Sequence, residues 1–324
     1  MTDPLFPLLY ILVFPGFLFL LAYALILEYI DRWITARMQN RVGPPWFQPF
    51  ADLIKMLSKE VIDPAGIDRR LFDAAPLVAL AAVMTAFIYV PVIGSSPFAF
   101  EGDIVLVLYL LSIPTIILFL LGWLSRNVYA AMGGIRTVTQ LFIYEVPFFL
   151  ALLTPALMAG SWSISSIVAW QQQHLWCAIL QPIGFIVALI GLQAKLERPP
   201  FDIPEAETEI VAGPWTELTG RRLAIMHLAV DVSLVVGSGL VAAMFLGGPA
   251  FPWSVEPGWL AGLSGLIVFL VKTFCVLFLL SAIKVATGRI RIDQLNDIGW
   301  KYIATAALVQ VALVLAIQSA RVIP

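Results

Sequence analysis

Eight long apolar stretches dominate this sequence. A transmembrane helix needs roughly 20 consecutive, mainly apolar residues to cross about 30 Å of hydrocarbon. We expect spans at about residues 6–29, 74–93, 104–124, 140–159, 177–196, 223–246, 259–283 and 300–319. Only 12% of the residues are charged and 60% are hydrophobic, a composition that excludes an ordinary soluble enzyme. The sequence therefore predicts an all-α integral membrane protein of eight transmembrane helices, with residues 1–324 forming one helical domain.

Positive charge is distributed unevenly among the connections between these spans. Of the 19 Lys and Arg residues, all but Lys272 and Arg321 lie in or beside the connections that follow the first, third, fifth and seventh spans. By the positive-inside rule these connections are cytoplasmic and both termini lie outside. We therefore expect a multi-pass protein of the cell inner (plasma) membrane.

The first of these connections contains a predicted surface helix at about residues 47–59. Phe50 and Ile54 fall on one helical face, while Asp52 and Lys55 fall on another. Such a helix is too short and too polar to span the bilayer, so we expect it to lie in the cytoplasmic interface. From this pattern alone, a plain membrane anchor is as good an interpretation as a functional one.

A basic run precedes the surface helix. Arg37 and Arg41 are four residues apart, so on a continuous helix they would share one face. We expect them to line a gap between the bundle and the surface helix, which favours the functional interpretation.

The connection at about residues 197–222 is unusually acidic. Asp202, Glu205 and Glu209 have the spacing of one helical stripe, and Glu197 and Glu207 add to the cluster. Crowded carboxylates raise one another's pKa toward the range of a proton carrier. Capping of a short helix by Asp202 and Glu205 is the structural alternative, but it leaves the other acids unexplained.

Three ionisable residues are predicted inside the bilayer: Glu145, Asp231 and Lys272. Each costs about 2.5–3.5 kcal/mol on insertion scales unless it has a partner or faces water, so each is a functional hypothesis. Lys272 lies near the middle of its span, and we expect Asp231 or Glu145 to pair with it. His227 is one turn before Asp231 and would suit a proton relay, although a lone His is more often a satisfied polar residue.

The sequence offers no catalytic centre. The two cysteines, Cys177 and Cys275, lack the spacing of a metal or cluster site, and no phosphate loop or nucleophile–base motif occurs. We therefore expect no catalytic residue, no metal and no cofactor in this chain, and any redox centre in partner subunits.

Three segments carry a family resemblance. They are Ala36–Pro44 with Gln48–Lys55 and Lys59-Glu60; Pro200–Gly213; and Asp293-Gln294-Leu295 with Gly299-Trp300-Lys301. In this order they resemble the complex I subunit 1 family, the H subunit of bacterial NADH:quinone oxidoreductase. The resemblance covers nearly the whole chain.

This resemblance implies a membrane subunit that joins a peripheral redox arm to antiporter-like pumping subunits. It implies a quinone cavity beside the surface helix, with Arg32, Arg37, Arg41, Asp52 and Lys55 on the cavity side. The residues assigned to the proton path are Asp202, Glu205, Glu207, Glu209, Glu217, Glu145 and Asp231, with Lys272 added from its depth in the membrane. Iron–sulfur clusters and a nickel–iron centre or flavin are expected only in partner subunits, and no nucleic acid is expected.

Two departures from quinone-reducing members stand out. The run Val42–Pro49 is short and lacks a second Gly-Pro, and Gly213-Pro214-Trp215-Thr216-Glu217 has unusual Pro and Thr residues. Both resemble the equivalent subunit of membrane-bound, energy-converting nickel–iron hydrogenases and related ferredoxin-dependent complexes. The last cytoplasmic connection, in contrast, resembles complex I itself.

We therefore predict a membrane subunit of a hydrogenase-like complex that couples redox chemistry in a peripheral arm to translocation of protons or sodium ions. A quinone-cavity subunit of complex I is the alternative within the family. A stand-alone secondary transporter, with Glu145, Asp231 and Lys272 as its site, and a purely structural anchor are alternatives of other classes.

Overall fold

A computed structural model describes residues 5–250 and 258–320 of the chain, without the side chains of a few residues such as 207 and 208. Every regular element within these residues is a helix. Seven of the described helices are long and apolar enough to cross a membrane. The predicted all-α, multi-pass membrane fold is therefore confirmed.

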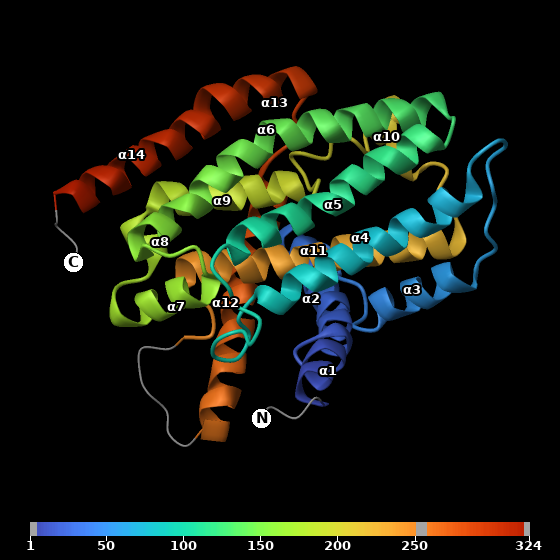
Figure 1. The fold of residues 1–324 in the computed structure, drawn as a ribbon. Coiled ribbons are helices and arrows are strands. Elements are labelled where there is room, and N and C mark those ends of the chain that lie inside the picture. The colour runs from blue at the N-terminus through green and yellow to red at the C-terminus, as the bar shows by residue number, and fades with distance from the viewer. Residues whose placement is uncertain (1–4, 251–257, 321–324) are drawn as a thin grey trace.

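The elements follow one another along the chain as in Figure 1. The long helices are α2 (Phe17–Met38), α4 (Arg69–Tyr89), α5 (Asp103–Leu124), α6 (Val128–Ala159), α11 (Gly220–Leu246), α12 (Gly258–Ala286) and α14 (Thr305–Ser319). The shorter elements are α1 (Leu5–Leu12), α3 (Gln48–Ser58), α7 (Ile164–Gln173), α8 (Cys177–Leu180), α9 (Pro182–Lys195), α10 (Glu207–Ile210), η1 (Gly213–Trp215), α13 (Ile292–Ile298) and η2 (Gly299–Ala304). The last candidate span, Ile292–Ser319, is the continuous helical run of α13, η2 and α14.

The fifth expected span is not one helix. Residues 177–195 form α8 and α9 with a break at Gln181, and α9 alone has 14 residues. Pro182 lacks an N–H and cannot continue the ladder of the preceding helix, which explains the break. The described residues therefore contain seven continuous candidate spans and this broken eighth segment.

Two helices extend well beyond their expected bounds. α2 continues to Met38, so Arg32 and Arg37 belong to the same helix as the first span. α6 begins at Val128 because the Asn127 side chain accepts a hydrogen bond from the Tyr129 N–H at 2.9 Å, which caps the helix. Hydropathy underestimates the length of both helices, because an apolar stretch ends at the first charged residues. The helical backbone continues to the next cap or turn.

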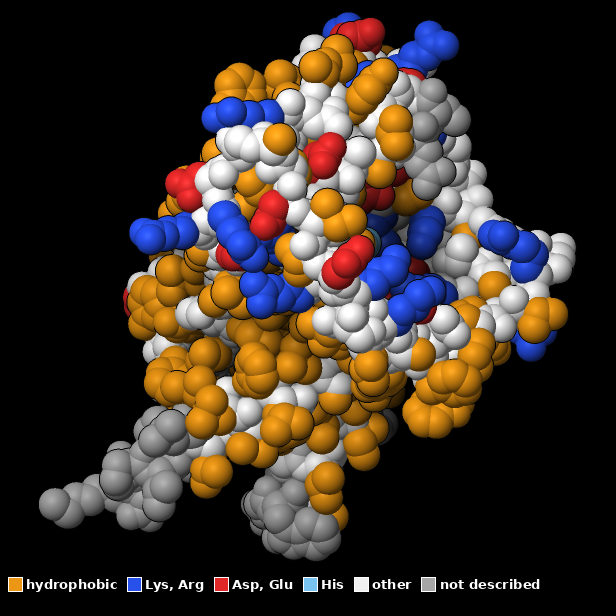
Figure 2. Space-filling model, turned by 90° about the vertical axis from the view of Figure 1, so that its right-hand side faces the viewer, with side chains coloured by type: hydrophobic (Ala, Val, Ile, Leu, Met, Phe, Trp, Pro, Cys, Tyr) orange, Lys and Arg blue, Asp and Glu red, His pale blue; other side chains and the backbone are white. Residues whose placement is uncertain are grey.

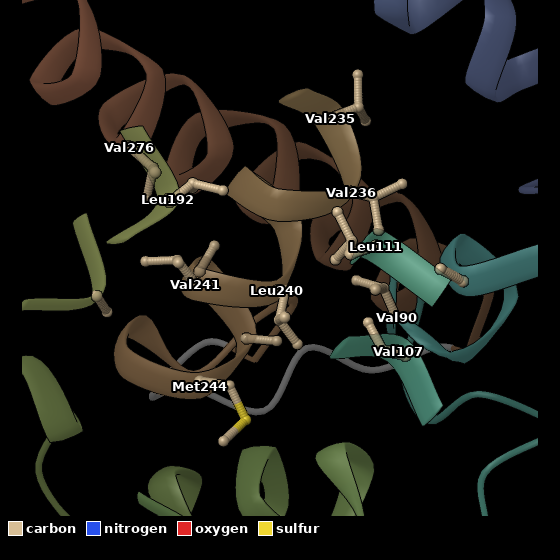
Figure 3. Packing of buried hydrophobic residues seen from close by; sticks show 14 of the residues in the cluster. Val90, Val107, Leu111, Leu192, Val235, Val236, Leu240, Val241, Met244 and Val276 are labelled. Carbon is tan, nitrogen blue, oxygen red and sulfur yellow. The ribbon is translucent and has the colours of Figure 1, made fainter. Parts of the chain in front are cut away.

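α11 is the central helix of the bundle. Figure 3 shows Val235, Val236, Leu240 and Met244 on α11, surrounded by side chains of neighbouring helices. Among these neighbours are Leu111 of α5, Leu192 of α9 and Val276 of α12, all buried. From Val232 to Phe245 every residue of α11 is buried, so polar groups in this part of the helix can reach only other protein groups or internal cavities.

Charged side chains gather at one end of the bundle. Figure 2 looks at the end where α3 leads into α4 and α5 meets α6, and it shows basic and acidic groups above a broad hydrophobic region. In Figure 1, α4, α5, α6 and α11 run in similar directions, whereas α2 and α12 cross them steeply. This distribution, with charged groups gathered at one end and apolar side chains over the sides, is typical of a protein embedded in a bilayer.

α3 occupies the segment for which a surface helix is expected. Phe50 and Leu53 pack inward against the main core, whereas Ile54 and Leu57 are exposed. The sequence pattern placed Phe50 and Ile54 on one face, but the contacts divide them between the core and the surface. α3 packs against both α2 and α11, and this arrangement encloses the site described next.

Candidate functional site

A cavity of about 320 Å³ lies between α2, α3 and α11. We name it the charged cavity because most of its wall is ionisable. Its lining consists of Leu25, Glu28, Arg32, Pro49, Asp52, Leu53, Lys55, Met56, Lys59, His227, Leu228 and Asp231. The sequence-predicted residues Arg32, Asp52, Lys55 and Asp231 therefore meet at one place.

Arg32 joins α2 to α3 across this cavity. Its Nε donates to Glu28 Oε1 at 2.5 Å and its NH1 donates to Asp52 Oδ2 at 2.9 Å. Gln48 also donates to Asp52 Oδ1 at 2.8 Å. Glu28 and Arg32 are one turn apart, so the helix itself brings them together. The surface helix is thus attached by charge-assisted hydrogen bonds as well as by Phe50 and Leu53.

The α11 wall of the charged cavity carries His227 and Asp231, one turn apart. The His227 ring stacks on Trp215 at 4.7 Å between centroids and 14° between planes. Trp215 belongs to η1, within the acidic segment of residues 197–222. This stacked pair separates the charged cavity from a second, smaller space.

That second space, which we name the inner pocket, has a volume of about 30 Å³, enough for about one water molecule. Its polar lining includes Lys195, Glu197, Glu205 and Ser233, and Trp215 forms part of its wall. Val230 lines the inner pocket and Asp231 lines the charged cavity, so consecutive residues of α11 face the two spaces. The Trp215–His227 stack and α11 therefore each contribute to the walls of both spaces.

Lys195 connects the inner pocket to Glu145. Its Nζ donates to Glu145 Oε2 at 2.7 Å and to Ser112 Oγ at 2.9 Å, while Ser112 Oγ donates to Glu145 Oε1 at 2.7 Å. The Lys195 side chain is 1% exposed, whereas that of Glu145 is 30% exposed. A buried ammonium is therefore balanced by a carboxylate that reaches toward the side of the bundle.

Glu197 lies just after α9 and lines the inner pocket. Burial, and next the negative charge of Glu205, raise the pKa of the Glu197 carboxyl well above its usual range. Lys195 lines the same pocket, but its ammonium is already paired with Glu145. A carboxyl whose pKa is raised, beside a second carboxylate, is suited to exchange a proton.

The half-buried Asp202 and the exposed Glu209 share Arg289. Arg289 contacts Asp202 Oδ1 at 3.8 Å and Glu209 Oε1 at 3.4 Å, and Arg136 NH1 donates to Glu209 Oε2 at 2.6 Å. The hydrogen bond from Arg136, followed by the charges of Arg136 and Arg289, lowers the pKa of Glu209. We name this group the arginine cluster; it keeps Glu209 ionised and joins the acidic segment to α6 and to the α12–α13 connection.

The predicted helical stripe of Asp202, Glu205 and Glu209 is wrong. α10 spans only Glu207–Ile210, so Asp202 and Glu205 precede it, and its N-cap residue is Ala206. The capping interpretation of Asp202 and Glu205 is wrong for the same reason. Pro204 and the tight turn at Gly213 divide the segment into short pieces, which direct Glu205 into the inner pocket and Asp202 toward Arg289.

Lys272 pairs with neither Asp231 nor Glu145, contrary to expectation. Its Nζ donates to the Ala250 carbonyl at 2.8 Å and lies 5.2 Å from the centre of the Trp176 ring. Within the described part of the chain no carboxylate forms an ion pair with it. Lys272 thus lies away from both cavities, and its contacts explain its burial without an acid partner.

Three further predicted residues also lie outside the two cavities. Glu217 accepts a hydrogen bond from Asn127 Nδ2 at 2.6 Å, which ties the acidic segment to the start of α6. Arg37 stacks on Trp33 at 5.6 Å, and Arg41 follows the end of α2 beyond Asn40, whose φ is 57°. Because α2 ends at Met38, Arg37 and Arg41 do not share a helical face. The Glu207 side chain lies outside the described residues.

Sequence reasoning missed a buried acid and its partners. Asp31 receives hydrogen bonds from Ser281 Oγ at 2.5 Å, from Lys284 Nζ at 3.2 Å and from Arg198. Its side chain is 2% exposed, so α2, α12 and the start of the acidic segment are joined at one carboxylate. Glu28 and Lys195 were missed as well. Each lies one residue inside the end of an expected span, a position typical of ordinary interfacial charges.

Within residues 5–250 and 258–320, no three His, Cys, Asp or Glu side chains are grouped to hold a metal ion.

Comparisons with known proteins agree with this architecture. A family model described as NADH dehydrogenase matches residues 10–315. The chain belongs to this NADH dehydrogenase family. It is 36% identical over 319 residues to the H subunit of NADH-quinone oxidoreductase from Carboxydothermus hydrogenoformans, covering 96% of this chain and 88% of that protein. It is also 36% identical over 312 residues to an H subunit of NADH-quinone oxidoreductase from Geobacter metallireducens, covering 91% and 92%.

A solved structure is similar throughout the fold. It is a chain of the membrane-bound sulfane sulfur reductase (MBS), an archaeal respiratory membrane complex, with a TM-score of 0.83 and 29% identity. The similarity covers 92% of this chain and 96% of that chain. This NADH dehydrogenase family member therefore has the fold of a subunit of a respiratory membrane complex, and the resemblance inferred from its three sequence segments is confirmed.

Proposed function

We propose that this chain is a non-catalytic membrane subunit through which electron transfer in partner subunits drives translocation of protons or sodium ions. One observation carries the proposal. Ionisable groups line the charged cavity and the inner pocket, the Trp215–His227 stack links the walls of these two spaces, and Lys195 of the inner pocket is paired with Glu145. In this proposal the charged end is cytoplasmic, both termini are outside, and the membrane is the plasma membrane.

The charged cavity is the end of this series that senses the redox reaction. A change of charge at an acceptor beside α3 would alter the balance among Arg32, Asp52 and Asp231, because opposite and like charges within a few ångströms shift protonation. Trp215 and His227 separate this event from the inner pocket. A small rearrangement of the stack would connect the two spaces and allow a proton to reach Glu205 and Glu197.

Partner subunits supply the redox chemistry in this proposal. The two relatives are named as subunits of oxidoreductases, and the structural neighbour is part of a respiratory complex. We infer a hetero-oligomer with a peripheral redox module at the charged end and antiporter-like subunits on an apolar side. A stand-alone transporter would instead retain its activity after separation from all other chains.

A quinone headgroup is the alternative occupant of the charged cavity, favoured by the names of the two relatives. Small-molecule pockets have volumes of about 300–1,000 Å³, so a cavity of about 320 Å³ is large enough for a headgroup. Its many charged walls suit the polar headgroup and do not suit an isoprenoid tail. The structural neighbour is a chain of a complex named as a sulfane sulfur reductase, so a sulfur-containing acceptor is also compatible with this proposal.

The decisive experiment compares Glu205→Gln with Glu209→Gln in the purified complex, reconstituted into vesicles. Glu205 lines the inner pocket, whereas Glu209 is on the surface among arginines. We expect Glu205→Gln to reduce ion translocation at least about tenfold, because it removes a positioned proton-transfer group. Electron transfer from the peripheral module to an artificial acceptor should persist. Glu209→Gln should retain most translocation, and wild-type translocation by Glu205→Gln would refute the proposal.

Glu197 gives a separate prediction about pH. Its pKa is raised in the folded protein, so the folded state binds more protons than the unfolded state above a pH of about 4.3, the usual pKa of Glu. Stability should therefore fall as the pH rises from that value toward the folded pKa. Glu197→Gln should flatten this part of the profile in thermal unfolding measured at several pH values, whereas Asp297→Asn, at an exposed site, should not. An unchanged profile in Glu197→Gln would contradict the assigned shift.

A further inference from the structure

An apolar groove of about 440 Å³ lies between α2 and α12, outside the charged cavity. Its α2 wall includes Phe19, Tyr23, Ile26 and Ile30, and its α12 wall includes Val271 and Phe274. These α2 residues are three or four positions apart and form one stripe. Glu28 and Arg32 project from the opposite side of the helix into the charged cavity. α2 therefore presents a polar face to the charged cavity and an apolar face to the groove.

The groove offers no polar group to a ligand at its base. Tyr23 is the only hydroxyl-bearing residue among the six named, and its hydroxyl is hydrogen-bonded to Thr273 Oγ1 in the buried contact between the two helices. A sugar or quinone headgroup would lose its hydrogen bonds with water there and find no replacement. A saturated hydrocarbon chain would lose none, so the groove suits an acyl chain.

The same stripe of α2 ends in a tryptophan and an arginine. Trp33 and Arg37 continue the spacing from Ile30 by three and four residues, so Arg37 lies about 10 Å beyond Ile30 toward the charged end. Trp33 is 42% exposed, and the Arg37 guanidinium lies 5.6 Å from the centre of its ring. Among the described residues no carboxylate forms an ion pair with Arg37. This differs from Arg32, which is paired with two acids.

We propose that the groove and Arg37 together bind one anionic phospholipid, with an acyl chain between α2 and α12 and the phosphate at Arg37. Tryptophan is favoured at the depth of lipid headgroups, and arginine at a helix end extends its charge into that layer. The unpaired guanidinium offers planar, paired donors to phosphate oxygens. The distance along α2 from the groove to Arg37 allows the acyl chain of one lipid to lie in the hydrocarbon layer while its phosphate reaches Arg37 at the interface.

Quenching of Trp33 fluorescence by brominated lipid tests this directly in the intact membrane complex. The probes are phosphatidylglycerol and phosphatidylcholine, each brominated near the carboxyl end of one acyl chain and present in otherwise identical vesicles. Subtracting the signal of Trp33→Phe isolates the Trp33 component among the 10 tryptophans. We expect phosphatidylglycerol to compete for the site about fivefold better than phosphatidylcholine, the preference expected from one basic residue at the surface.

Matched variants distinguish the contribution of the lipid headgroup to binding from that of the acyl chain. Arg37→Gln should remove the preference for phosphatidylglycerol, whereas Arg70→Gln, which removes another exposed arginine, should keep it. Ala22→Phe should fill the groove and reduce the quenching of Trp33 by both lipids. Ala81→Phe, at an exposed position of α4, should leave this quenching unchanged.

Two results would overturn the proposal. Equal quenching by the two lipids in the wild-type complex would exclude recognition of the anionic headgroup. Absence of any quenching of Trp33 by brominated lipid would mean that a helix of a partner subunit, rather than lipid, covers this face. Neither readout depends on ion translocation.

Discussion

Glu145→Gln is expected to destabilise the protein more than Lys195→Met. Removal of Glu145 leaves the ammonium of Lys195 almost fully buried, with Ser112 and the Tyr144 and Phe148 rings as its remaining neighbours. Removal of Lys195 leaves a carboxylate that is 30% exposed and can be hydrated. We expect a loss on the order of 3 kcal/mol for Glu145→Gln and roughly half of that for Lys195→Met. Thermal or denaturant unfolding of the purified complex measures both.

The double variant Glu145→Gln/Lys195→Met distinguishes the structural role of this pair from its functional role. Without either charge the site should recover much of the stability lost in Glu145→Gln, because no unpaired ion remains buried. Ion translocation should remain lost in all three variants, since the proposed path ends at Glu145. A double variant that regains translocation would show that the pair serves stability alone, and a larger loss for Lys195→Met than for Glu145→Gln would contradict the burial argument.

Gly213→Ala should displace the acidic segment from the bundle. Gly213 has a φ of +52°, and a Cβ there would lie 2.0 Å from the Pro204 carbonyl oxygen. On the other side of this turn, a Cβ at Gly133 of α6 would lie 2.5 Å from Pro214 Cδ. The turn therefore has no space to move in either direction. We expect a cost on the order of 2–4 kcal/mol, since backbone strain and a steric clash both arise.

This displacement has a local signature. Trp215 follows the turn directly and stacks on His227, so Gly213→Ala should increase proteolysis within residues 204–215 and loosen the separation of the two cavities. Gly133→Ala should have the same effect from the α6 side. Gly288→Ala is the control, because a Cβ there meets no atom within 4 Å. Equal protease resistance in Gly213→Ala and Gly288→Ala would rule out this account of the turn.

The sequence predicted the parts of the fold that depend on local chemistry. Apolar length located seven continuous helices and the broken α8–α9 segment, while amphipathic spacing located α3. It erred where a helix continued beyond its apolar residues, as α2 does to Met38, and where a proline interrupted an apolar run, as at Pro182. In both cases hydropathy measures solvent preference, whereas helix ends are fixed by backbone hydrogen bonds and caps.

The candidate site was predicted less completely. Arg32, Asp52, Lys55 and Asp231 were selected as candidates from the sequence, and all four line one cavity, while Glu205 lines the other. Lys195 was overlooked because its partner Glu145 is 50 residues away in the chain, and Lys272 was given an acid partner although a carbonyl and an aromatic ring satisfy it. Such pairings depend on distances between helices, which periodicity within one helix does not contain.

The sequence by itself determined that this protein is a helical membrane protein of the NADH dehydrogenase family with an acidic connection and one charged end. Those properties follow from transfer free energies and residue order, which act locally along the chain. Only the tertiary structure decided that Glu205 faces an inner pocket while Glu209 faces surface arginines, and that one aromatic stack separates two ionisable cavities. Close packing around α11 leaves each of these groups one set of neighbours, and the identity of those neighbours determines which carboxyls hold a proton.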